Sequence, residues 1–244
     1  MTQAASPTSA PSAGRQPARG PSARERLVRH ATEIFAAKGF AAASTREICE
    51  AAGVNVASIH YYFGDKAGLY RETLLRPIAE VIHACGRFDD PALSFEESMR
   101  LLLGSILGLA PNAKDEAFEV QVMRLHLREM LEPSGAFREV IEQTIAPAHR
   151  ALCGLLARHC GLDAPDDDIH RLAFALVAMA NDYCLSREMM KLLAPGVLSG
   201  PRAGEQVLDR LLGYARALLD HEIARRRAVP ANANPACSPT GAGT

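Results

Sequence analysis

Hydrogen-bonding side chains crowd one short segment near the start of the chain. Residues 56–63 contain a serine, a histidine and two tyrosines, at Ser58, His60, Tyr61 and Tyr62. Their hydroxyl and ring-nitrogen groups suit phosphate oxygens and the edges of bases. The segment could therefore bind DNA. The spacing fits an alternative equally well, in which the tyrosines are half-buried packing rings, since short helical hairpins are common in all-helical proteins.

The residues before this segment predict two short helices joined by a glycine turn. Ser44 and Glu47 have the spacing of a capping box, in which hydroxyl and carboxylate satisfy the free amides at a helix start. Gly53 can adopt the left-handed conformation that ends this helix. Asn55 is a favourable cap for a second helix over 56–63. In such a helix-turn-helix, the second helix lies in the major groove of DNA.

The second helix should have one buried and one exposed face. Ile59 and Phe63 lie four residues apart and share the buried face. The residues left to meet DNA are Val56, Ala57, Ser58, His60 and Tyr61. A preceding helix, which begins at a second capping box at Ser22 and Glu25 and ends at Gly39, should brace the pair.

A longer stretch around this motif resembles the signature of the TetR family of bacterial transcriptional regulators. It covers residues 45–70, which read T-R-E-I-C-E-A-A-G-V-N-V-A-S-I-H-Y-Y-F-G-D-K-A-G-L-Y, and extends back through residues 27–44, LVRHATEIFAAKGFAAAS. The resemblance implies a three-helix DNA-binding domain joined to a helical ligand-binding and dimerisation domain. By matching position, it implies DNA contacts, mostly to phosphates, by Thr45, Arg46, Asn55, Ala57, Ser58, His60, Tyr61 and Lys66.

Two residues depart from the family pattern. Family members usually have tyrosine in place of His60, and a contact made by an imidazole would depend on pH. They usually have alanine in place of Cys49, which we interpret as a small apolar residue on the buried face of its helix.

Charge is divided unevenly along the chain. The 244 residues, 48% of them hydrophobic, suffice for one large or two smaller domains. Residues 1–88 hold 11 of the 27 Lys and Arg residues but only 7 of the 28 Asp and Glu residues, a net charge of +4, which leaves −5 for the rest. This asymmetry suits a basic DNA-binding domain on an acidic body.

The ends of the chain and its cysteines carry weaker signals. We expect a disordered arm at 1–21, whose composition lacks the apolar core of a secretory signal, a DNA-binding domain at 22–68, a regulatory and dimerisation domain at 69–226 and a disordered tail at 227–244. Arg15, Arg19 and Arg24 could contact phosphates or the minor groove, or simply be solvated.

The six cysteines and the histidines lack metal-site spacing, so no metal or cofactor is expected.

The remaining sequence predicts an all-α protein of about nine helices, with no strand pattern. A fourth helix from Asp65 to about Gly86, with a kink at Pro77, should join the two domains. The other predicted helices cover 94–110, 114–131, 136–159, 167–193 and 205–225. The apolar stretches fall short of the roughly 20 residues that span a bilayer, so we expect a cytoplasmic protein with no membrane partner.

Two apolar seams in the last helices are the predicted homodimer interface, which would pair as a four-helix bundle. Its residues are Leu172, Leu176, Met179, Tyr183, Leu208, Leu211, Ala215 and Leu218. The open alternative is that both seams close the core of one chain.

A mixed set of side chains is the predicted ligand pocket: Leu103, Phe118, Val122, Met123, His126, Met130, Phe137 and Asn181. For each of these residues, a place in the core is the alternative.

With this resemblance, the sequence predicts a dimeric repressor that a small-molecule effector releases from a palindromic operator. Two alternatives remain, namely a constitutive DNA-binding dimer and a helical enzyme with a DNA-binding domain. Against the enzyme, the chain has no phosphate-binding glycine loop, nucleophile elbow or H-E-x-x-H motif, so no catalytic residue is predicted. Nothing in the sequence identifies the effector.

Overall fold

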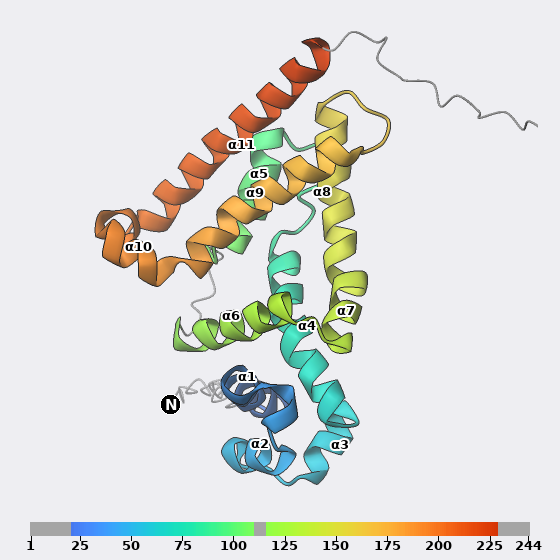
Figure 1. Cartoon of the computed structure of the whole chain (residues 1–244), viewed down its shortest axis with the longest axis vertical. Coiled ribbons are helices and arrows are strands. Elements are labelled where there is room, and N and C mark those ends of the chain that lie inside the picture. The colour runs from blue at the N-terminus through green and yellow to red at the C-terminus, as the bar shows by residue number, and fades with distance from the viewer. Residues whose placement is uncertain (1–20, 110–115, 229–244) are drawn as a thin grey trace, which may run out of the picture.

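A computed structural model describes residues 21–109 and 116–228, and the predicted N-terminal arm with Arg15 and Arg19 and nearly all of the C-terminal tail lie outside this part. Every regular element within it is helical, as the sequence predicts (Figure 1). None of the described helices is both long and apolar enough to cross a bilayer.

The DNA-binding domain predicted from the sequence forms one end of the molecule, which we call the head (Figure 1). It contains α1 (Ala23–Ala42), α2 (Thr45–Ala52), α3 (Ala57–Phe63) and the start of α4 (Lys66–Ala84). The capping box of Ser22 and Glu25 is present with both of its hydrogen bonds. Gly39 leaves the helix with φ of 79°, which glycine adopts without the cost that a side chain would add.

The start of α2 differs from the prediction in one bond. The Ser44 hydroxyl caps the helix by accepting a hydrogen bond from the Arg46 amide at 3.2 Å. The carboxylate of Glu47, however, accepts from Lys38 Nζ at 2.5 Å. A salt bridge to α1 thus takes the place of the reciprocal bond expected for a capping box, and it holds α2 against α1.

The rest of the described chain, which we call the body, continues with α5 (Phe95–Ile106), α6 (Glu116–Leu131), α7 (Gly135–Val140), α8 (Ala146–His159), α9 (Asp167–Leu185), α10 (Arg187–Leu193) and α11 (Ala203–Ala228). Two predicted helical stretches are divided. A π-helical turn, η1 (Ile141–Ile145), separates α7 from α8 within one column that runs along the molecule (Figure 1). The stretch over 167–193 breaks at Ser186, whose φ of −95° and ψ of 16° leave the helical range and whose hydroxyl donates to the Asp182 carboxylate at 2.6 Å. A short 3-10 helix, η2 (Pro195–Leu198), follows α10.

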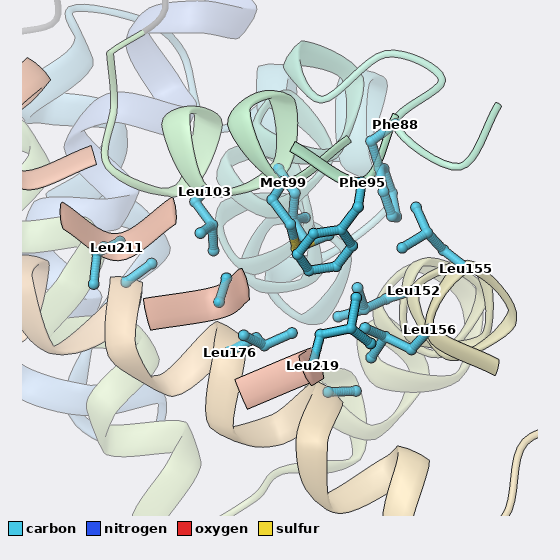
Figure 2. Close-up of a cluster of buried hydrophobic side chains, with 14 of the residues drawn as sticks. Phe88, Phe95, Met99, Leu103, Leu152, Leu155, Leu156, Leu176, Leu211 and Leu219 are labelled. Atoms are coloured by element: carbon cyan, nitrogen blue, oxygen red, sulfur yellow. The ribbon is translucent and has the colours of Figure 1, made fainter. Parts of the chain in front are cut away.

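Two clusters of buried apolar side chains stabilise the fold. The body cluster joins α5, α8, α9 and α11 and includes Phe95, Met99, Leu156, Leu176 and Leu219 (Figure 2). The head cluster gathers side chains from α1 to α4, but it is completed by Leu125 of α6 and by Phe137 and Val140 of α7. The core of the head therefore extends beyond the sequence range predicted for the DNA-binding domain.

The two seams predicted to form the dimer interface lie inside one chain instead. Their buried members belong to the body cluster: Leu172, Leu176, Leu208, Leu211 and Ala215. The other three, Met179, Tyr183 and Leu218, pack against this cluster. The seams join α9 to α11 within the chain, which is the alternative left open by the sequence. Any pairing of two chains through these helices must use their other faces.

Candidate nucleic-acid interface

Helix α3 has the predicted buried and exposed faces. Ile59 is 1% exposed and belongs to the head cluster, and Phe63 packs against that cluster. The Asn55 side chain accepts a hydrogen bond from the Ala57 amide at 2.9 Å, so it caps α3 as predicted. The turn before it is also as predicted, because Gly53 ends α2 in the left-handed conformation with φ of 63°.

The two tyrosines of α3 are exposed to different extents. Tyr61 is 82% exposed, and its ring stands nearly perpendicular to that of Tyr62, with centroids 4.8 Å apart. The alternative interpretation of Tyr61 as a half-buried packing ring is therefore wrong. Tyr62, in contrast, is only 40% exposed. An exposed phenol on a helix whose opposite face is buried is available to a partner, and its hydroxyl can bind a phosphate.

His60 is exposed, and only one of its ring nitrogens is free. Nδ1 lies 2.8 Å from the carbonyl oxygen of Gly64. Because a carbonyl only accepts hydrogen bonds, Nδ1 must carry the proton, which makes Nε2 of the neutral ring an acceptor. Phosphate oxygens are acceptors too. A contact from His60 Nε2 to phosphate therefore requires the doubly protonated ring.

Three of the predicted DNA-contact residues line one open surface hollow of about 410 Å³: Arg46, Asn55 and Val56. Arg46 donates through Nε to Glu50 at 2.9 Å, and both side chains of this ion pair are largely exposed. Cys49 also lines the hollow; its side chain is buried, as predicted, and burial raises the pKa of its thiol.

Lys66 joins the start of α4 to the end of α1. Its ammonium lies 4.6 Å from the centre of the Phe40 ring and 3.4 Å from the Ala41 carbonyl oxygen. The remaining ammonium donors can still bind a phosphate. Of the other predicted residues, Thr45 is partly buried at the first position of α2, and Ser58 is partly buried on α3.

The head is less strongly basic than the net charge of residues 1–88 suggests, because most of its described cationic side chains form ion pairs with carboxylates. The ion pairs are Arg24–Glu72, Arg29–Glu33, Lys38–Glu47, Arg46–Glu50, Arg71–Glu139 and Arg76–Glu80. Exposed pairs of this kind contribute at most about 1 kcal/mol each. A phosphate can therefore displace a carboxylate from the exposed pair of Arg46 at small cost.

The residues predicted to line a ligand pocket are dispersed. Leu103 lies in the body cluster and Phe137 in the head cluster, while Met130 is exposed on α6. The guanidinium of Arg29 in α1 lies over the Phe118 ring, 5.2 Å from its centre. The others are the buried Val122 and His126 and the partly buried Met123 and Asn181, and none of the eight lines the hollow at α2 or a second one at the end of α8. The eight residues thus do not gather around one hollow in the described part of the chain, and two of those on α6, Phe118 and His126, contact the head instead.

Sequence reasoning missed two polar links between α6 and the head. Tyr70 of α4 donates its hydroxyl to Glu129, and both side chains are buried. His126 lies on α6 with Nε2 3.1 Å from the Leu74 carbonyl oxygen in α4. The partners lie 59 and 52 positions apart in the chain, so no local spacing could have indicated them.

Known protein families match both parts of this structure. The model described as "Bacterial regulatory proteins, tetR family" matches residues 27–73. The model described as "HTH-type transcriptional dual regulator CecR, C-terminal domain" matches residues 95–220. The HTH-type transcriptional dual regulator CecR of Shigella flexneri is 30% identical over 184 residues, which cover 71% of this chain and 81% of that protein.

Solved structures share the fold at lower identity. A TetR-like transcriptional regulator from Rhodococcus sp. RHA1 matches with a TM-score of 0.56 and 20% identity, over 84% of this chain and 99% of that one. The TetR family regulator PfmR from Thermus thermophilus matches with a TM-score of 0.52 and 20% identity, over 80% and 97%. These relatives are described as transcriptional regulators, and none of them as an enzyme. The chain belongs to the TetR family of bacterial transcriptional regulators and carries that family's helix-turn-helix DNA-binding domain.

Proposed function

We propose that the protein is a cytoplasmic repressor that binds a palindromic operator as a homodimer, and that a small-molecule effector bound to the body releases it. The observation that carries this proposal is the outward face of α3, where Tyr61 is 82% exposed opposite the buried Ile59. A constitutive DNA-binding dimer is the alternative, and the two differ in whether any ligand changes the affinity for DNA.

The proposed contacts divide into two kinds. Arg46, Tyr61 and Lys66 bind phosphates, with support from Thr45 and Asn55 at the helix starts and from His60 in its protonated form. Val56, Ala57 and Ser58, at the start of α3, face base edges and set the sequence preference. Loss of a phosphate contact should weaken binding to all sequences equally, whereas changes at Ala57 or Ser58 should alter preference.

For the dimer, we propose the outer surface of α9, α10 and α11. Large apolar side chains remain exposed there, namely Phe174, Leu185, Met189, Leu192, Leu193 and Tyr214. Contiguous exposed apolar side chains often mark a protein interface. Two heads held about 34 Å apart could then occupy successive major grooves on one side of the operator.

The dimer surface has a matched test. Leu192 and Leu131 are 85% and 84% exposed, on α10 and α6 respectively. Sedimentation equilibrium should find a dimer for the unaltered chain and for Leu131→Glu, and a monomer for Leu192→Glu. A dimer that survives Leu192→Glu but dissociates with Leu131→Glu would place the interface elsewhere.

The effector would act through α6 and α7, because both helices contribute side chains to the head cluster. A ligand shifts the population of two states only by as much as its affinity for them differs. An effector that moves α6 would therefore change the position of α1 and α4, through the Tyr70–Glu129 and His126–Leu74 contacts.

DNA binding is tested with two arginines of equal exposure. The side chains of Arg46 and Arg87 are each 82% exposed and each pairs with an acidic residue, but Arg87 lies in the loop that follows the far end of α4. After operator selection from random DNA, fluorescence anisotropy should show weaker binding for Arg46→Ala and unchanged binding for Arg87→Ala. The dependence of log K on log salt should fall by about one unit for Arg46→Ala alone. Equal losses for both variants, or no selected sequence, would refute the interface.

A further inference from the structure

Three potential metal-binding side chains meet where α8 packs on α9. His149 and Cys153 lie four residues apart and thus on one face of α8, and His170 lies near the start of α9. His149 Nε2 and His170 Nδ1 are 2.9 Å apart. Cys153 Sγ lies 3.4 Å from the first nitrogen and 3.3 Å from the second. The ring nitrogens that face each other also face the sulfur, so the three atoms surround one point.

We propose that His149, Cys153 and His170 bind a thiophilic transition metal ion of the zinc class, with water or another solute in a fourth position. Two imidazoles and one thiolate suit zinc, cobalt or copper, whereas magnesium and calcium prefer oxygen ligands. The inference concerns the body alone and does not depend on the proposed DNA contacts or effector.

The geometry is close to that of an occupied site. Tetrahedral zinc, with its usual bond lengths, places two nitrogen ligands about 3.3 Å apart and nitrogen and sulfur about 3.6 Å apart. The observed separations, 2.9 Å and 3.3 to 3.4 Å, are shorter by a few tenths of an ångström. Small side-chain rotations would open the triangle enough to admit the ion.

The surroundings hold the ligands in this arrangement. Cys153 is fully buried in the body cluster, while both histidines are partly exposed and give access from solvent. The His149 ring stacks on His170, with centroids 5.2 Å apart, and on Phe174, with centroids 4.6 Å apart. The ligands thus come from two helices whose packing is already fixed.

Protonation of the free site is compatible with metal binding. Burial, with a contribution from the neighbouring His170, lowers the pKa of His149, which favours the neutral imidazole that metals require. Burial raises the pKa of the Cys153 thiol. As the metal–sulfur bond forms, the thiol proton must therefore leave to solvent. No oxidant or reductant is needed.

The test is a titration of the full-length, reduced and metal-free protein with Co²⁺, which reports tetrahedral thiolate ligation through its absorption spectrum. We expect one Co²⁺ per chain, a thiolate-to-cobalt charge-transfer band in the near ultraviolet, and loss of this band when Zn²⁺ is added. Native mass spectrometry should find one Zn²⁺ per chain. Cobalt binding without a thiolate band, or no binding at micromolar metal, would overturn the proposal.

Variants identify the ligands. Cys153→Ser and His170→Gln should each abolish the charge-transfer band and weaken Co²⁺ binding by at least about tenfold. The matched control is Cys160→Ser, which removes a partly buried thiol seven residues further along the chain, at the end of α8, and should leave the band unchanged. Circular dichroism checks folding, and the partly exposed His170 provides a ligand variant outside the buried core. Loss of the band in Cys160→Ser, or its persistence in folded His170→Gln, would refute the site.

Discussion

Removal of a single hydroxyl should show how strongly the head is joined to α6. Tyr70 of α4 and Glu129 of α6 are both buried, and the phenol donates to the carboxylate. Glu129 also accepts from the Ser134 amide at 2.8 Å. Burial raises the pKa of Tyr70 well above its usual range, with a further contribution from the bond to Glu129, so the phenol keeps its proton.

Tyr70→Phe keeps the aromatic ring but takes one donor from a buried carboxylate. The edge contact of this ring with Phe35, with centroids 4.8 Å apart, should survive the substitution. A hydrogen bond to a charged group contributes about 1.5–3 kcal/mol. Because Glu129 keeps the amide of Ser134, we expect the free energy of unfolding to fall by about 2 kcal/mol. For a domain of this size, each kcal/mol lowers Tm by roughly 2–4 °C.

Urea unfolding followed by circular dichroism measures this loss. The control is Tyr62→Phe, since Tyr62 is 40% exposed on α3, and its effect should stay within about 0.5 kcal/mol. A double-mutant cycle with Glu129→Gln should give a coupling energy of at least about 0.5 kcal/mol. A loss below about 0.5 kcal/mol for Tyr70→Phe, or strict additivity in the cycle, would refute the reasoning.

Three further substitutions test other features. Gly39→Ala forces a side chain into positive φ and against the guanidinium of Arg128, so urea unfolding should show a loss of at least about 1 kcal/mol; an unchanged midpoint would contradict this. Arg226 binds Asp166 through two bonds of 2.7 and 2.8 Å and lowers the pKa of that carboxyl, so its contribution is complete above about pH 4 and falls progressively as the pH drops further. The drop in unfolding free energy between about pH 5 and 3 should therefore be smaller in Asp166→Asn than in the unaltered chain, and equal drops would contradict the assignment. His60→Tyr should bind the operator more tightly, as measured by anisotropy, because a phenol hydroxyl can donate to a phosphate whereas Nδ1 of His60 is already bound to the Gly64 carbonyl; an unchanged affinity would contradict this.

Local chemistry explains what the sequence could predict. Ser22 caps its helix because its hydroxyl and the carboxylate of Glu25 lie three residues apart, and this capping box is present. Asn55 and Gly53 act within a few bonds of their own position, so the helix-turn-helix and its exposed residues could be predicted without tertiary information.

Features that depend on distant partners could not be predicted. The spacing of Phe118, Val122 and His126 indicates a helix face but not what covers it; Arg29 of α1 lies over the Phe118 ring, and His126 contacts the Leu74 carbonyl of α4. The cluster of His149, Cys153 and His170 escaped notice for the same reason. Its members come from two helices, and a histidine four residues before a cysteine is not by itself a metal motif.

The composite core of the head bears on how this regulator can be dissected. Leu125, Phe137 and Val140 come from beyond residue 116, so a fragment ending after α4 would leave apolar surface uncovered and should aggregate or unfold. We therefore expect that the head does not fold as an independent domain when it is fused to another protein. A substitution that weakens the packing of α6 or α7 should reduce DNA binding by unfolding the head itself, in addition to any change in the distance between the two heads of a dimer.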